Sequence, residues 1–329
     1  MIDVQAVLDG NRLAISRLIS QIENDTPEGQ RALSELFSYT GKAHLIGVTG
    51  APGTGKSTLV NQIAYHYRHP TNSSTPKTVA IVAVDPTSPF TGGALLGDRI
   101  RMTGLSGDLG VFIRSMATRG SLGGLANTTA GVVQAFDAAG YHVILIETVG
   151  AGQAEVDIAR LAHTTLVVEA PGLGDDIQAI KAGILEIADI LVVNKADRPG
   201  IESTERALRN MLQLADPQVR SEFKNSENGE SLWETPIQCT IAIEGNGVTE
   251  VIDLISKHRV YLEKTGDLKR RERIRLETEL THRLQKLLIT QWREQLSDGL
   301  FEKVLDRLLT REISPQEAVT QLMKGGSGE

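Results

Sequence analysis

A glycine-rich segment near the N-terminus has the residue types and spacing of a phosphate-binding loop. Residues 50–57 read GAPGTGKS and fill the pattern G-x-x-x-x-G-K-[ST]. In such a loop, glycines let successive backbone N–H groups surround an anion, the lysine reaches the β- and γ-phosphates, and the serine hydroxyl ligates Mg²⁺. We therefore expect nucleotide contacts from Gly50, Ala51, Pro52, Gly53, Thr54, Gly55, Lys56, Ser57 and Thr58.

A second segment can select the base. Residues 194–197 read NKAD and directly follow the apolar run ILVV. A carboxylate at Asp197 can accept hydrogen bonds from both N–H donors on the guanine edge, a pair that adenine lacks. Asn194 can bond the other polar edge of the ring, and the Lys195 stem can pack across the purine face. The two segments together favour GTP over ATP.

Acidic residues that end two apolar runs are candidate partners of a metal ion. Asp85 ends VAIVAVD, Glu147 ends VILIE, and Asp98 lies between them. The carboxyl ends of strands in an open α/β sheet surround the ligand site, and Mg²⁺ prefers oxygen ligands. We assign Ser57, Asp85, Asp98 and Glu147 to Mg²⁺ or its waters, and Lys56, Asp85 and Glu147 to catalysis. Helix caps or loop acids are the alternative for Asp85 and Asp98.

The segment that begins at Glu147 reads ETVG where many P-loop GTPases have D-x-x-G. This spacing predicts a bond from Gly150 to the γ-phosphate. The longer glutamate side chain can also approach the attacking water, and Gln153 is a weaker candidate for orienting that water.

Residues 91–126 are rich in glycine and arginine, which is typical of a segment that changes shape with the nucleotide. Its arginines are candidates for stabilising transition-state charge, with loop anchoring or an interface as the alternative for each: Arg99, Arg101, Arg114 and Arg119.

The elements that must position these residues indicate an α/β fold. Residues 1–40 have apolar residues at helical spacing and predict an N-terminal helical extension. Residues 41–261 alternate short β-branched runs with helical stretches, which predicts a G domain with a mostly parallel central sheet. Residues 262–329 predict a helical C-terminal arm, in which a long amphipathic helix precedes two shorter ones. We expect this arm to form a homodimer; folding back on its own domain is the alternative.

Composition excludes several classes of protein. The 329 residues carry a net charge of −7, which argues against a general nucleic-acid binder. The single cysteine, Cys239, excludes a disulfide framework and is typical of a reducing cytoplasm. No signal peptide and no run of about 18 apolar residues is present, so we expect no membrane partner.

The chain resembles the MeaB/ArgK type of P-loop GTPase over nearly its whole length. The likeness is carried by the phosphate loop, the NKAD tetrad and four further segments: VAVDPTSPFTGGALLGDRIRM, FIRSMATRGSLGGLA, VILIETVGAGQAEVD and VEAPGLGDDIQAIKAGILEIAD. Members of this family are GTPase chaperones of adenosylcobalamin-dependent acyl-CoA mutases, chiefly methylmalonyl-CoA mutase. Some members carry an older label as arginine/ornithine transport ATPases or kinases.

The resemblance implies a Mg²⁺-dependent switch that cycles between GTP and GDP and gates loading and protection of the mutase cofactor. It assigns Arg99, Arg101, Gln178 and Lys181 to coupling between nucleotide state and the mutase, and it implies a homodimer through the C-terminal arm. Three other readings stay open on residues alone. They are a metallochaperone GTPase, which would need a His- or Cys-rich cluster, a protein-targeting GTPase, which would need a methionine-rich groove, and a small-molecule kinase.

Overall fold

The computed structural model describes residues 2–70, 74–86, 103–105, 107–118, 124–148, 154–172, 186–214, 232–297 and 299–326. It divides into two compact units, Met1–Arg275 and Leu276–Glu329. The predicted sites at Asp98, Arg99, Arg101, Arg119, Gly150, Gln153, Gln178 and Lys181 lie outside the described residues.

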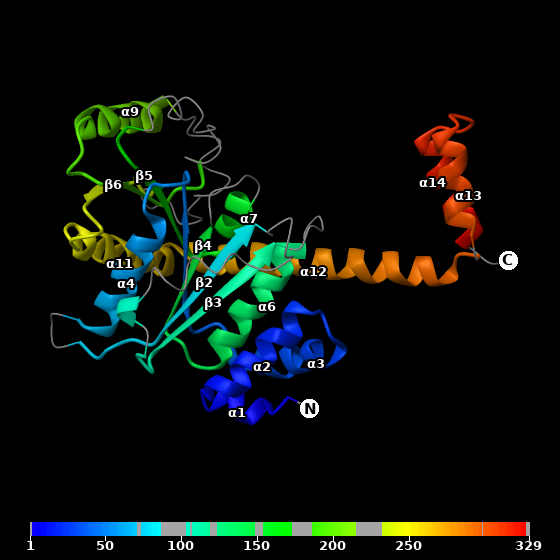
Figure 1. Ribbon diagram of the computed structural model, residues 1–329, viewed down its shortest axis with the longest axis horizontal. Helices are drawn as coiled ribbons and strands as arrows, with labels where there is room; N and C mark the ends of the chain where they lie inside the picture. Colours follow the sequence, from blue (N-terminus) through cyan, green and yellow to red (C-terminus); the bar gives the residue numbers. More distant parts are fainter. Residues whose placement is uncertain are drawn as a thin grey trace. The chain divides into compact units, whose positions relative to one another are not determined.

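The described part of the first unit is built on a seven-stranded sheet in the order β3-β2-β4-β1-β5-β6-β7 (Figure 1). All of its pairings are parallel. The strands are β1 (His44–Thr49), β2 (Val79–Pro86), β3 (Val111–Thr118), β4 (Val143–Thr148), β5 (Thr164–Glu169), β6 (Ile190–Asn194) and β7 (Ile237–Thr240). The seven apolar runs of the sequence thus form the predicted sheet, and the α/β fold class is confirmed.

Helices cover both faces of this sheet, which is why its strands are apolar almost throughout. On one face, α4 (Lys56–Arg68) and α11 (Val248–Thr265) pack against side chains such as Ile46 and Val48 of β1. On the other face lie α6 (Gly124–Ala138), α7 (Ala154–Leu161) and α9 (Ile201–Leu214). A short 3-10 turn, Thr103–Leu105, contributes buried Leu105 to the α4 side.

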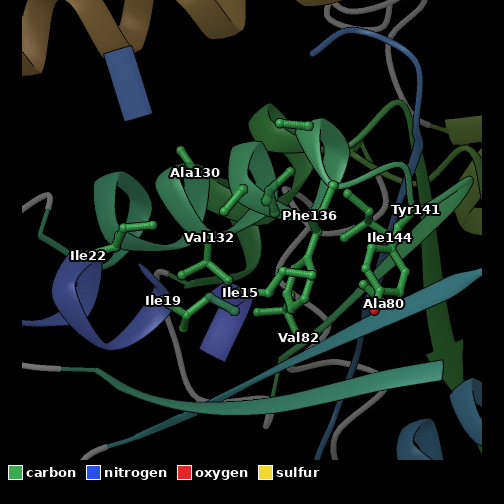
Figure 2. Close-up of a cluster of buried hydrophobic side chains, with 14 of the residues drawn as sticks. Ile15, Ile19, Ile22, Ala80, Val82, Ala130, Val132, Phe136, Tyr141 and Ile144 are labelled. Atoms are coloured by element: carbon green, nitrogen blue, oxygen red, sulfur yellow. The ribbon is translucent and has the colours of Figure 1, made fainter. Parts of the chain in front are cut away.

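The N-terminal helices form an additional layer over α6. Figure 2 shows Ile15, Ile19 and Ile22 of α2 (Arg12–Glu23) facing Val132 and Phe136 of α6. Before α2 stands α1 (Val4–Leu8), and after it α3 (Pro27–Leu36) and a 3-10 turn, Phe37–Tyr39.

Local signals divide the N-terminal extension into separate helices. Gly10 has φ +74°, a left-handed conformation that ends α1, and the Asn11 side chain then caps α2 by accepting from the Leu13 and Ala14 N–H groups. The Thr26 side chain caps α3 by accepting from the Gly29 N–H group, with Pro27 at the first helical position.

The C-terminal residues are helical as predicted. A long helix, α12 (Asp267–Gln295), follows α11 after Gly266, and α13 (Leu300–Leu309) and α14 (Pro315–Gly326) come after it. Val304, Ile313 and Ala318 form a small core between α13 and α14. The predicted boundary between the G domain and the C-terminal arm, between residues 261 and 262, stays a prediction. Helix α11 runs across that point, and the chain passes from one compact unit to the other after Arg275, within α12. Among the described residues, no helix has the length and apolar character needed to cross a bilayer.

Candidate nucleotide site

The loop between β1 and α4 requires glycine at two positions because of close neighbours. At Gly50, with φ +135°, a Cβ atom would lie 2.1 Å from the carbonyl oxygen of Val168 in β5. At Gly55, with φ +96°, a Cβ atom would lie 2.3 Å from Nδ2 of Asn194. No side chain fits at either distance, so the loop is held against β5 on one side and against the NKAD tetrad on the other.

Lys56 opens α4 and turns back into the loop. Its ammonium donates hydrogen bonds of 2.9 Å to the carbonyl oxygens of both Gly50 and Ala51. The residue is only 5% exposed, so its ammonium group is buried inside the loop. A cation there, together with the N-terminus of α4, attracts a phosphate group.

Ser57 and Glu147 meet directly beside this loop. The strand register pairs Glu147 of β4 with Val48 of β1. The side chains of Glu147 and Val48 therefore lie on the same face of the sheet, the face that α4 covers. The Ser57 hydroxyl donates a 2.6 Å hydrogen bond to Oε1 of Glu147, which is 4% exposed. One residue further along these two strands, on the opposite face of the sheet, the Thr49 and Thr148 hydroxyls are 2.9 Å apart.

This pair has the chemistry of a magnesium site. A hydroxyl and a carboxylate are hard oxygen donors of the kind that Mg²⁺ takes alongside phosphate oxygens and waters. Ser57 and Glu147 would hold Mg²⁺, which would supply positive charge to offset that of a bound triphosphate. Glu147 can also hold a proton-accepting oxygen near that position. Asp85 lies near the carboxyl end of β2, which neighbours β4 because Val84 pairs with Thr148, but its side chain lies outside the described residues.

Asn194 joins the base-binding tetrad to the phosphate loop. Its Nδ2 donates a 2.8 Å hydrogen bond to the carbonyl oxygen of Thr54. Its Oδ1 accepts from the Thr240 hydroxyl at 3.1 Å and from the Ala242 backbone N–H at 3.0 Å. All of these atoms are buried, so the carboxamide fixes three segments relative to one another.

Lys195 and Asp197 occupy different environments. Lys195 has φ +59°, and its ammonium donates a 2.5 Å hydrogen bond to the carbonyl oxygen of Gly53. Its side chain therefore lies over the phosphate loop. Asp197 is exposed two residues further on, where its carboxylate is accessible to the donors of a purine.

Sequence reasoning missed Thr240, Ala242 and Val168, which brace the site without themselves matching a phosphate or base motif. Thr240 and Ala242 belong to the apolar run QCTIA, which follows NKAD in the sequence. Because the carboxyl ends of parallel strands lie at one edge of the sheet, this run could have indicated that the two residues lie near NKAD. Arg114, a predicted candidate for transition-state charge, instead forms an ion pair with Glu23 of α2. This contact is the anchoring alternative noted for the arginines.

Comparison with known proteins agrees with this geometry. Residues 15–297 match the family described as methylmalonyl-CoA mutase-associated GTPase MeaB. A Pyrococcus abyssi protein named as a GTPase is 43% identical over 98% of this chain and 96% of its own length. The Escherichia coli GTPase ArgK is 30% identical over 97% of this chain and 94% of its own.

Two further matches extend the comparison. The mouse methylmalonic aciduria type A homolog, mitochondrial, is 29% identical over 85% of this chain and 64% of its own length. The crystal structure of an LAO/AO transport system kinase has the same fold, with a TM-score of 0.65 and 22% identity over 98% of this chain and 95% of that one. On the family match and these relatives, the chain belongs to the MeaB family of P-loop GTPases.

Proposed function

We propose that this GTPase requires Mg²⁺ and acts as a nucleotide-controlled chaperone of an adenosylcobalamin-dependent acyl-CoA mutase, methylmalonyl-CoA mutase first among them. The observation that carries the magnesium requirement is the 2.6 Å contact between Ser57 and Glu147 beside the buried Lys56. This contact places two hard oxygen donors next to the Lys56 ammonium, which turns back into the phosphate loop.

The family description supports the mutase as partner, because it names a methylmalonyl-CoA mutase-associated GTPase. In our proposal, the GTP and GDP states differ in affinity for the mutase, and hydrolysis switches the protein from one state to the other. Arg99, Arg101, Gln178 and Lys181 would carry that difference, which gates loading of intact cofactor and removal of damaged cofactor. The reaction would take place in the cytoplasm.

A homodimer through the C-terminal arm is part of the same proposal. In the second unit, α12 exposes a stripe of leucines at helical spacing, each more than half exposed: Leu280, Leu284, Leu287 and Leu288. A stripe of this kind on a charged helix is suited to a second copy of the same helix.

The proposal is tested by measuring phosphate release from GTP with Mg²⁺ or with EDTA, each in the presence and absence of purified methylmalonyl-CoA mutase. We expect release that depends on Mg²⁺ and changes when the mutase is added, and binding to the mutase that differs between GDP and a non-hydrolysable GTP analogue. Lys56→Ala is the matched inactive control. Equal release in EDTA, or nucleotide-independent mutase binding, would contradict the proposal.

A further inference from the structure

His163 uses its side chain to extend the sheet at the end opposite the phosphate loop. It immediately precedes β5, and its backbone N–H donates a 2.9 Å hydrogen bond to the carbonyl oxygen of Leu45 in β1. In return, the Leu45 N–H donates to the ring Nδ1 of His163 at 3.2 Å. The imidazole nitrogen thus serves as the acceptor that a strand carbonyl would normally supply.

The surrounding donors fix the protonation of this ring. The Arg259 guanidinium of α11 places Nη1 3.2 Å from the same Nδ1. A guanidinium and a backbone N–H can only donate, so Nδ1 must carry a lone pair and the proton must lie on Nε2. Nε2 faces Oε2 of Glu272 in α12 at 3.7 Å. The bonded form of His163 is therefore the neutral one.

Cationic groups surround this ring more densely than acidic ones. His163 is 7% exposed, and its ring stacks with that of His44 of β1 at 6.0 Å between ring centroids. The other groups that act on the ring are Arg259 of α11 and Glu272 and Arg275 of α12. His258 of α11 acts on His44, and Arg271 of α12 binds the backbone carbonyl of His163. Arg259 is itself paired with Glu263, and Arg275 with Glu272. Burial, reinforced by Arg259 and Arg275 and opposed by Glu272, lowers the pKa of His163.

The same residue is attached to the first turns of α12. Arg271 donates from Nη1 to the His163 carbonyl oxygen at 3.0 Å, and its guanidinium also binds the buried Asp189 carboxylate at 2.8 Å. His163 therefore joins the start of β1, the strand that leads into the phosphate loop, to residues 267–275 of α12.

We propose that His163 is a pH-sensitive junction: its neutral ring holds β1 to α11, and protonation at Nδ1 releases that contact. A proton on Nδ1 would face the Leu45 N–H and the Arg259 guanidinium, so both contacts would be lost together. His163 lies at the far end of the sheet from Lys56 and Glu147.

The sign of the pH effect follows from the direction of the shift. A histidine whose folded-state pKa is lowered stays neutral in the fold while the unfolded chain takes up a proton. Its contribution to stability is complete above its ordinary pKa of 6.5 and is lost as the pH falls from there towards the folded-state value. Each such histidine lowers the folding constant by up to about tenfold per pH unit in that window.

Urea unfolding of the full-length protein between pH 5.0 and 7.5 tests the proposal. His163→Asn is the informative variant, because the amide oxygen can accept where Nδ1 does but does not titrate. Below pH 6.5, the folding constant of wild type should fall with each pH unit by close to tenfold more than that of His163→Asn. His44, whose pKa burial also lowers, leaves a residual slope. The exposed His69→Asn is the matched control and should keep the wild-type slope. Equal slopes for wild type and His163→Asn would overturn the proposal.

A second measurement uses only the wild-type protein, so it does not depend on the folding of a variant. Deuterium exchange at the imidazole C2 position, followed for each histidine-containing peptide by mass spectrometry, gives a titration midpoint for His163. We expect a midpoint below 6.5, with faster backbone exchange in the peptide that contains Leu45 at pH 5.5 than at pH 7.5 after correction for intrinsic rates. A midpoint at or above 6.5, or unchanged exchange in that peptide, would refute the proposal.

Discussion

The side-chain nitrogen of Asn194 lies 2.8 Å from the carbonyl oxygen of Thr54, so the NKAD tetrad and the loop between β1 and α4 are directly bonded. Lys195 makes a second such bond, to Gly53. Because these contacts come from consecutive residues, the position of the tetrad is coupled to the shape of the loop.

Guanine selectivity should depend on Asp197. We expect Asp197→Ala to weaken GTP binding at least a hundredfold, since two charge-assisted hydrogen bonds are worth about 1.5–3 kcal/mol each. Fluorescence competition with GTP and ATP measures the change, and the exposed neighbour Arg198→Ala is the control. Near-normal GTP affinity in Asp197→Ala would remove the base assignment.

The close approach at Gly55 should make the loop intolerant of a methyl group. We expect Gly55→Ala to abolish GTP binding, because its Cβ would lie 2.3 Å from Asn194 Nδ2. Gly53→Ala is the matched comparison, since it also has a positive φ but no atom within 4 Å of the added Cβ. It should retain measurable binding at a cost of about 1–2 kcal/mol from backbone strain. Equal loss in both variants would show that the contact with Asn194 is unimportant.

Glu147 should affect hydrolysis more than nucleotide binding. Replacing its charged carboxylate by an amide in Glu147→Gln preserves shape and the contact with Ser57 but removes the charge beside the metal position. We expect phosphate release to fall by about a hundredfold or more, the scale of a lost general base, and the Mg²⁺ concentration for half-maximal activity to rise. Calorimetric GDP affinity without Mg²⁺ should change little. An unchanged rate at saturating Mg²⁺ would contradict the role given to Glu147.

Arg271 should contribute strongly to stability. Its partner Asp189 is 1% exposed, so Arg271→Ala leaves a buried carboxylate without its guanidinium. We expect a loss of about 3–5 kcal/mol in unfolding free energy, measured by urea denaturation at pH 7.5. The exposed Arg209→Ala, which removes a surface pair with Glu205, should cost about 1 kcal/mol or less. Similar small losses in both would argue against a structural role for the Arg271 pair.

The C-terminal arm should be required for dimerisation and dispensable for nucleotide binding. A chain ending after Arg275 keeps α11 and the Arg271 contacts but removes the exposed leucines of α12. We expect it to be a monomer by light scattering and to bind GTP as tightly as the full chain. A dimeric mass after this truncation would place the interface elsewhere.

The sheet was predictable because its strands are short, apolar and β-branched, and because buried parallel strands leave that pattern in a sequence. The positions of Lys56, Ser57, Glu147 and Asn194 were predictable for a related reason. Glu147 and Asn194 stand at the carboxyl ends of strands, and Lys56 and Ser57 open the helix that follows the loop after β1. The approach of Gly50 to Val168 was not, since it depends on how two strands pack rather than on any local pattern.

Residues that act at a distance in the sequence were missed for similar physical reasons. Thr240 and Ala242 bind Asn194 only after β7 has joined the sheet beside β6. The ring of His163 has no motif, and its role follows from a backbone donor on β1 and a guanidinium on α11. The sequence gives a glycine at position 10, but it does not say that this glycine adopts the left-handed conformation that ends α1.

Calorimetric titration of the full-length protein with GTP and with ATP, both with Mg²⁺ present, tests the central claim most directly. The account predicts tight GTP binding, weaker ATP binding by at least a hundredfold, and loss of the difference in Asp197→Ala. Equal affinity for the two nucleotides, or binding of neither, would contradict it.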